Sequence, residues 1–181
     1  RFGNSVSVGR EAFRNLSRAE KNDYTKGKAY AKLIIAATSF LQSRNDLALK
    51  YITEALRWFD SNTAEKGYVR AILLKGSIFE SFGDYEKTLS LWLEAYKVSK
   101  EITDPDSEGE ACSQLGLIYS RLSDLSKALE YFNKGLKIRE EMGDDNAVAS
   151  SLNRIGMVLR QLNKYDESLE YYFRRLEIRK N

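Results

Sequence analysis

Histidine is absent from this sequence, and cysteine and proline occur once each in its 181 residues. Without histidine, the chain lacks the side chain that most often serves as a general base or a metal ligand. This absence speaks against most hydrolytic mechanisms, so we expect no enzyme activity, no catalytic residue, no metal ion and no cofactor in these residues. The single cysteine, Cys112, cannot form an intrachain disulfide.

Long apolar runs are missing as well. No window approaches the roughly 18 apolar residues of a membrane-spanning helix, and the start of the chain, RFGNSVSVGREAFR, lacks the apolar core of a signal peptide. We therefore expect no membrane insertion and favour a cytoplasmic location, with the periplasm left open. Because the sequence does not begin with methionine, we interpret it as a processed or excised piece of a longer protein.

Positive charge is concentrated at the start of the chain. Residues 1–32 contain eight Lys and Arg against three Asp and Glu. This pattern is typical of a solvated helix face, and contact with an acidic surface or nucleic acid is the alternative. The sequence pI of about 8.8 is below the value above 9 that indicates a nucleic-acid-binding domain, so we expect no nucleic-acid partner.

The sequence repeats itself with a period of forty residues. The stretch from Leu115 to Arg139 returns as Ile155 to Arg179, and steps of forty place Ala36, Gly76, Gly116 and Gly156 in one column of small residues. A second column holds only leucine (Leu49, Leu89, Leu129, Leu169), and a third holds large residues (Ile52, Trp92, Phe132, Tyr172). Such self-similarity is typical of stacked repeats that bury their apolar faces on their neighbours.

The sequence pattern predicts that each repeat is an antiparallel helix pair. Apolar residues recur at helical spacing in both halves of a repeat, and short polar breaks such as Gly83-Asp84 and Asn163-Lys164 separate the halves. Gly or Asn can close one helix in the left-handed conformation, and Asp suits the N-cap of the next. The scarcity of proline also favours helices. We predict helices at about 25–42, 46–60, 64–82, 86–101, 105–122, 126–141, 146–162 and 166–180.

The predicted fold is all-α, a right-handed superhelical array of antiparallel helix pairs. The single array over 1–181 consists of the second helix of a truncated repeat (8–20), repeat 1 (25–60), repeat 2 (64–101), repeat 3 (105–141) and repeat 4 (146–180). We expect both ends to be cuts into a longer protein. We also expect repeat 1 to carry a one-residue shift, because Phe40 and Leu41 fit the aromatic and leucine columns better than Ser39 and Gln42.

Some residues have an explanation in packing alone. We expect Cys112 to be a buried apolar residue, because it shares a column with Ile72 and Leu152. The column glycines lie inside helical patterns, so we interpret them as sites of close packing rather than phosphate loops. Arg175 departs from its column, which otherwise holds Ala55, Ala95 and Gly135.

The pattern resembles the tetratricopeptide repeat. The glycine column, the aromatic residues Phe79 and Tyr119, the sequence GDYEKTL from Gly83 to Leu89 and the sequence ALEYF from Ala128 to Phe132 carry this resemblance. Tetratricopeptide repeats usually have about 34 residues, and the period of forty looks like the longer-helix subgroup. The sequence LKIREEMGDDNAVASSLNRIG looks most like that of bacterial members, whose arrays precede histidine kinase, diguanylate cyclase or adenylate cyclase modules.

This resemblance implies a protein–protein interaction module that binds a peptide or helical segment in a groove lined by first helices. We expect it to be the regulatory or sensor part of a larger signalling protein, such as a two-component regulator, and a stand-alone scaffold or adaptor is the alternative. By register, the expected groove residues are Arg70, Leu73, Ser77, Glu80, Glu110, Ser113, Leu117, Arg121, Asn153, Met157, Arg160 and Gln161, and repeat 1 offers Tyr30, Leu33 and Ala37.

The expected ligand is an acidic, amphipathic protein segment. Leu117 and Met157 would contact its apolar side, and Arg121 and Arg160 would pair with its acidic residues. The groove lacks the Lys and Asn pattern with which chaperone-binding relatives hold a C-terminal carboxylate, so that ligand class is disfavoured. The alternative is that these side chains simply form the solvated inner face of a spacer. We also expect self-association through an uncapped last repeat, around Leu169, Tyr172 and Leu176.

Overall fold

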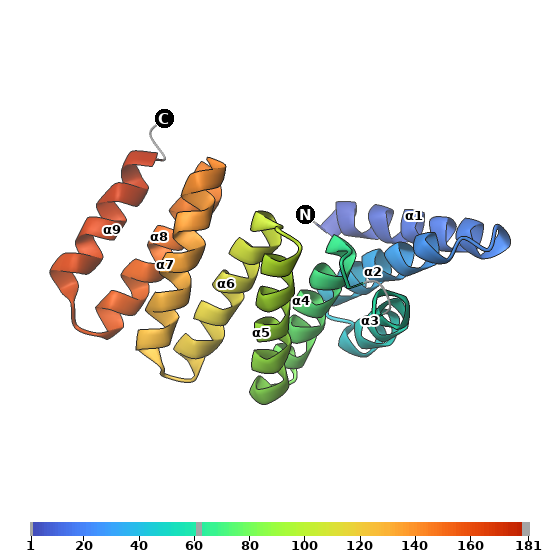
Figure 1. Ribbon diagram of the computed structural model, residues 1–181, viewed down its shortest axis with the longest axis horizontal. Helices are drawn as coiled ribbons and strands as arrows, with labels where there is room; N and C mark the ends of the chain where they lie inside the picture. Colours follow the sequence, from blue (N-terminus) through green and yellow to red (C-terminus); the bar gives the residue numbers. More distant parts are fainter. Residues whose placement is uncertain (1, 61–62, 179–181) are drawn as a thin grey trace. The chain divides into compact units, whose positions relative to one another are not determined.

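The computed structural model describes residues 2–60 and 63–178, with side chains from residue 7 onward. Within these ranges every regular element is an α-helix, which confirms the predicted all-α class (Figure 1). The helices are α1 (Phe2–Lys21), α2 (Thr25–Leu41), α3 (Asn45–Phe59), α4 (Lys66–Ser81), α5 (Tyr85–Glu101), α6 (Pro105–Arg121), α7 (Leu125–Met142), α8 (Asp145–Gln161) and α9 (Tyr165–Ile178).

The observed bounds of α2 to α9 lie within two residues of the predicted ones, except that residues 179–180 of the last predicted helix are outside the described residues. The prediction for the first helix was too short. It begins at Phe2 rather than at residue 8, because residues 2–7 lack the apolar spacing that marked the predicted start and contain no proline to stop a helix.

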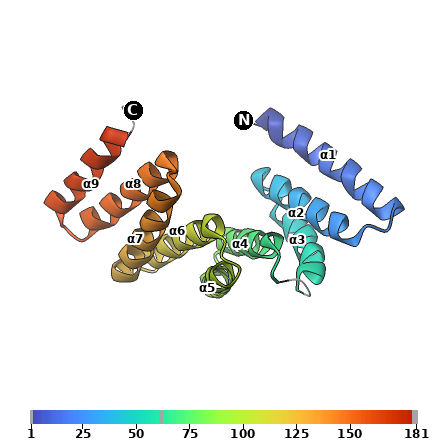
Figure 2. The same cartoon turned by 45° about the horizontal axis from the view of Figure 1, so that its top comes forward.

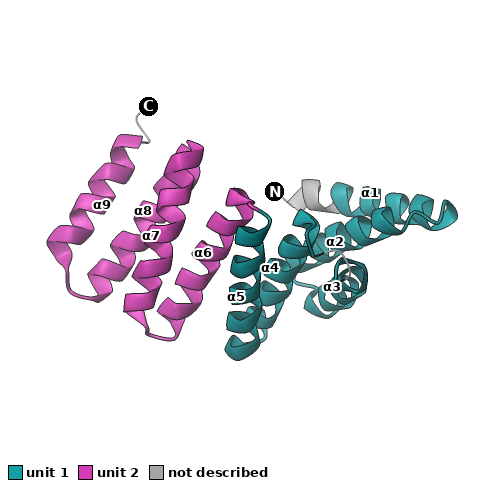
Figure 3. Ribbon diagram, in the orientation of Figure 1, with its two compact units in different colours: residues 1–102 teal, residues 103–181 magenta. Residues whose placement is uncertain are grey.

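The chain forms two compact units, residues 1–102 and residues 103–181 (Figure 3). In the first unit α1 packs on α2, α2 on α3, α3 on α4 and α4 on α5. In the second unit α6 packs on α7, α7 on α8 and α8 on α9. Figure 2 shows these successive helices side by side within each unit. The assignment of these helices to four repeats and a preceding second helix stays a prediction.

The turns between helices repeat with a spacing of twenty residues. A residue with positive φ stands in each of seven turns: Asp23, Ser43, Gly83, Thr103, Ser123, Gly143 and Asn163. Three of the following aspartates, Asp84, Asp124 and Asp144, accept a hydrogen bond from the backbone N–H three residues later. The polar breaks therefore end one helix in the left-handed conformation and cap the next, as their composition predicts.

Thr103 is the residue least suited to its turn. It has φ of 54°, and a β-branched side chain in the left-handed region is strained. We expect Thr103→Gly to raise the free energy of unfolding by about 0.5–1 kcal/mol, since glycine adopts this conformation without the steric cost. Urea denaturation measures the change. The control Thr53→Gly, inside α3, should lower stability instead, and a loss of stability in both variants would contradict the assigned strain.

The column glycines make room for the large residue of the following helix. A Cβ on Gly76 would lie 2.3 Å from the Trp92 ring, one on Gly116 would lie 2.5 Å from the Phe132 ring, and one on Gly156 would lie 2.7 Å from Tyr172. The predicted close packing is confirmed, and the partner is an aromatic ring of the second helix.

Repeat 1 has no register shift. Helix α2 has 17 residues, as α6 does, and the two ranges differ by eighty residues. Ser39 is 5% exposed and Leu41 is 65% exposed, so the serine occupies the buried aromatic column and the predicted shift is wrong. Neighbouring Thr38 donates its hydroxyl to the Ile34 and Ile35 carbonyls, which satisfies a polar side chain at a buried helix position. Cys112 is fully buried, as predicted.

Candidate functional site

The expected groove residues on α4 belong to the first unit. Arg70 is exposed, and Ser77 and Glu80 are partly buried. Leu73 is only 8% exposed, and its carbonyl accepts the Trp92 Nε1–H hydrogen bond at 3.1 Å. Leu73 is therefore a core residue, whereas the other three remain accessible to a ligand.

In the second unit the expected groove residues lie on α6 and α8. Five of the eight are exposed (Glu110, Arg121, Met157, Arg160 and Gln161), and Leu117 and Asn153 are partly buried. Ser113 is 2% exposed because its hydroxyl packs against a side chain of α7. The groove itself stays a prediction, and burial removes Leu73 and Ser113 as contact residues.

The partner of Ser113 is Arg139, an arginine that α7 places between α6 and α8. Arg139 Nη1 donates to Ser113 Oγ at 2.6 Å and to Ser151 Oγ at 2.8 Å. Its Nη2 lies 3.5 Å from Glu110 Oε2, and only 13% of the Arg139 side chain is exposed. This one guanidinium therefore ties α6 and α8 to α7 through polar contacts inside a helical repeat.

The two serines depart from columns that are apolar in the earlier repeats. Ser151 shares its column with Ala31, Ala71 and Ala111, whereas the column of Arg139 is mixed and holds Phe59, Ser99 and Arg179. Ser113 stands in the same column as Leu33 and Leu73. The sequence analysis noted departures at Ser39 and Arg175 but did not single out Arg139 or Ser151. A comparison of every column for polar outliers would have found Ser151, but not Arg139, because Arg179 stands in the same column.

Two further arginines lie beside this network. Arg154 of α8 is partly buried, with its Cζ 6.0 Å from the Phe132 ring centroid. Burial lowers the pKa of the Arg154 guanidinium; the Glu110 carboxylate raises that pKa, and the Arg139 charge lowers it. Arg175 of α9 donates from Nη1 to Asn153 Oδ1 at 2.9 Å. We call Arg139, Arg154 and Arg175 the three-arginine cluster.

A small recess opens beside the cluster in the second unit. Its volume is about 210 Å³, and it is lined by Ala149, Ser150, Asn153, Arg154 and Arg175. Pockets for whole small molecules usually measure about 300–1,000 Å³. The recess therefore has room for one side chain or one small anionic group.

The outer surface of α9 is apolar in part. Leu169, Phe173 and Leu176 are between 50% and 61% exposed. Tyr172 is only partly buried by its neighbours and packs its ring against Gly156. Self-association through this surface stays a prediction.

No group of three or more His, Cys, Asp or Glu side chains that could hold a metal ion occurs among the residues that the structure describes. Within the same residues, no helix combines the length and the apolar character needed to cross a membrane.

Solved structures share this fold at low sequence identity. BtubC (BKLC) from P. vanneervenii superposes with a TM-score of 0.84 at 19% identity, over 98% of this chain and 73% of that one. A Rap protein complexed with Competence and Sporulation Factor superposes with a TM-score of 0.86 at 16% identity, over 98% of this chain. A putative kinesin light chain of Podosopora anserina superposes with a TM-score of 0.75 at 9% identity, over 97% of this chain and 87% of that one. These identities establish the fold alone.

The chain covers only 49% of the length of the Rap protein. Among curated proteins, none matches the sequence. The sequence does match the family model of the tetratricopeptide repeat, over residues 68–141 and 113–181. Together these matches span more than half of the chain. The chain therefore belongs to the tetratricopeptide repeat family.

Proposed function

We propose that the chain is a protein–protein interaction module that binds an acidic, amphipathic segment of a partner protein. In the second unit the segment lies against α6 and α8. The observation that carries the proposal is the exposure of Arg121, Met157 and Arg160 on these first helices, in a family whose repeats support a protein-binding role. For the first unit, the accessible α4 residues Arg70, Ser77 and Glu80 belong to the same proposal.

The chemistry of this surface favours a ligand with two faces. Leu117 and Met157 offer apolar contacts to one side of an amphipathic helix. Arg121 and Arg160, both exposed, pair with acidic residues at the edge of the contact, each contributing about 0.2–1 kcal/mol. Because the charged contacts are exposed, binding should weaken as the salt concentration rises.

A displayed library of random peptides tests the proposal directly. We expect selection on the purified chain to enrich amphipathic peptides rich in Asp and Glu. The double change Arg121→Glu with Arg160→Glu should weaken the binding of an enriched peptide at least tenfold, because two attractive contacts become repulsive. Fluorescence anisotropy measures the affinity, and circular dichroism should show unchanged helicity.

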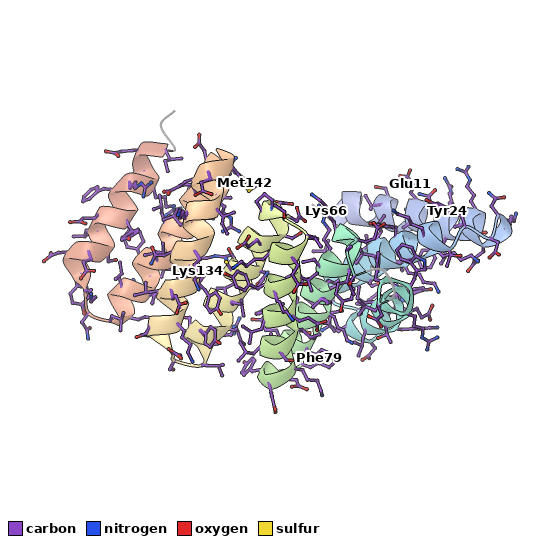
Figure 4. The ribbon with its side chains drawn as sticks, viewed as in Figure 1. Glu11, Tyr24, Lys66, Phe79, Lys134 and Met142 are labelled. Atoms are coloured by element: carbon purple, nitrogen blue, oxygen red, sulfur yellow. The ribbon has the colours of Figure 1, made fainter. Side chains whose placement is uncertain are left out.

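The matched control reverses two charges on α7 in the same unit. Lys127 and Lys134 are exposed and form ion pairs with Asp124 and Glu130. Lys127 also lies over the Tyr119 ring, and Lys134 is labelled in Figure 4. Lys127→Glu with Lys134→Glu should leave peptide affinity within about twofold. An equal loss of affinity in both double variants would mean that the ligand responds to net charge and that the groove assignment is wrong.

Within this function, we place the chain in the regulatory or sensor part of a larger signalling protein. The fold shared with the Rap protein, whose structure contains Competence and Sporulation Factor, supports an array that carries a bound factor. A stand-alone adaptor is the alternative. The coding sequence on either side of this segment decides between them, since a kinase or cyclase module there supports the first and its absence supports the second.

A further inference from the structure

Positive charge in the three-arginine cluster exceeds the negative charge that faces it. Among the residues that the structure describes, Glu110 is the one carboxylate paired with any of the three arginines. Its other oxygen, Oε1, already accepts a hydrogen bond from Gln114 Nε2 at 2.7 Å. The cluster therefore carries a net positive charge in a partly buried site, where electrostatic interactions are stronger than on an open surface.

The three arginines differ in how fully their donors are used. Arg139 reaches Ser113, Ser151 and Glu110. Arg175 has one hydrogen bond, to Asn153. For Arg154 the described residues provide the Phe132 ring but no hydrogen-bond acceptor.

A guanidinium that is partly removed from water without an acceptor is costly. Arg139 has such acceptors, and its contacts hold α6, α7 and α8 together. The donors of Arg154 and the remaining donors of Arg175 can therefore bind an anion.

Packing does not require arginine at these positions. In the same column as Arg154 the other repeats have Ile34, Leu74 and Gln114, and in the column of Arg175 they have alanine or glycine. Two columns therefore depart from the repeat pattern at one place in the second unit. A repeat that needed only helix packing would have no reason to carry two adjacent half-buried charges there.

We propose that Arg154 and Arg175, which both line the recess, bind the carboxylate of an aspartate or glutamate side chain of the partner segment. This inference rests on the proposed function and adds an anion site that the groove prediction does not contain. The planar guanidinium fits a carboxylate through two parallel hydrogen bonds, so arginine is suited to this ligand. The recess of about 210 Å³ admits one such side chain.

Two capped tripeptides test the site without knowledge of the natural partner. The probe is acetyl-Gly-Glu-Gly-amide, and acetyl-Gly-Gln-Gly-amide is its neutral match. Titration is followed by the NMR signals of the arginine Nε–H groups in the ¹⁵N-labelled chain. We expect the Glu tripeptide to shift the Arg154 and Arg175 signals saturably, and the Gln tripeptide to leave them unchanged. Equal shifts with both tripeptides would overturn the proposal.

The test variants introduce residues that other repeats carry in the same columns. Glutamine occurs at the position equivalent to Arg154 in repeat 3 (Gln114), and alanine occurs at the positions equivalent to Arg175 in repeats 1 and 2 (Ala55 and Ala95). Both variants, Arg154→Gln and Arg175→Ala, should therefore fold. We expect Arg154→Gln to abolish the saturable shift of the Arg175 signal, and Arg175→Ala to abolish that of Arg154. The matched control is Arg174→Ala, which removes one charge from the same helix but takes it from the pair with Glu140. Loss of the shift in this control as well would overturn the site.

A third probe, acetyl-Gly-phosphoserine-Gly-amide, distinguishes the kind of anion. Binding of this probe at least tenfold tighter than the Glu tripeptide would overturn the carboxylate assignment in favour of a phosphopeptide. The selected library peptides separate this inference from the proposed function. Retention of full peptide affinity by Arg154→Gln and Arg175→Ala would reject the site and leave the function standing. A library that yields no binder would reject the function, whereas the tripeptide titration would still report on the site.

Discussion

Replacing Gly116 by leucine is expected to lower the free energy of unfolding by about 3 kcal/mol, the upper part of the usual range for overpacking. The first added carbon would lie 2.5 Å from Cδ1 and Cε1 of Phe132. That ring is 2% exposed, so any movement displaces the side chains packed around it. Because neighbouring helices in a repeat array stabilise one another, hydrogen exchange should also accelerate in α8. A melting midpoint equal to that of the unchanged chain would contradict this explanation.

A compensating change shows whether the ring is the cause. Repeat 1 carries Ala36 and Ile52 where repeat 3 carries Gly116 and Phe132, and both residues of repeat 1 are fully buried. Gly116→Ala alone should therefore destabilise the chain, and addition of Phe132→Ile should recover part of the loss. A double-mutant cycle by urea denaturation measures this coupling. Strict additivity of the two changes would show that they do not act through one contact.

Truncation of Trp92 is expected to have an effect at least as large in the first unit. Trp92 is fully buried, packs against Gly76 and donates its Nε1–H to the Leu73 carbonyl. Trp92→Ala removes the ring and leaves that carbonyl without its indole donor, so the free energy of unfolding should fall by about 3–5 kcal/mol. Chemical denaturation followed by circular dichroism measures the loss.

The other tryptophan provides the control. Trp58 is only partly buried, so Trp58→Ala should cost less than Trp92→Ala. Trp92→Phe keeps most of the packing, as Phe132 does in repeat 3, and should lose about 1 kcal/mol with the hydrogen bond. A larger loss from Trp58→Ala than from Trp92→Ala would show that burial does not rank these two sites.

The helix bounds were predictable from the sequence because local features determine them. The apolar spacing, the left-handed residue of each turn and the aspartate caps all recur within twenty residues, and each acts over one or two turns of helix. The two errors have the same origin. The start of α1 and the register of α2 were inferred from apolar spacing in stretches where polar residues such as Ser39 occupy the column, and a helix tolerates such residues when their polar groups are bonded.

The candidate site was only partly predictable. Register identified the first-helix positions, and most of them are accessible, but it gave no measure of burial for Leu73 or Ser113. Both are core residues because of partners from other helices, Trp92 and Arg139. Column comparison can flag a polar outlier such as Arg175, yet it does not say which outliers meet.

The sequence by itself determined the helices, their turns and the family, because all of these depend on residues near one another in the chain or on a repeated column. Only the tertiary structure decided that Arg139, Arg154 and Arg175 gather beside one recess. Their helices, α7, α8 and α9, bring together side chains up to 36 positions apart in the chain. The charge balance and solvation of such a site depend on distances in space, which neither the repeat period nor the helical spacing specifies.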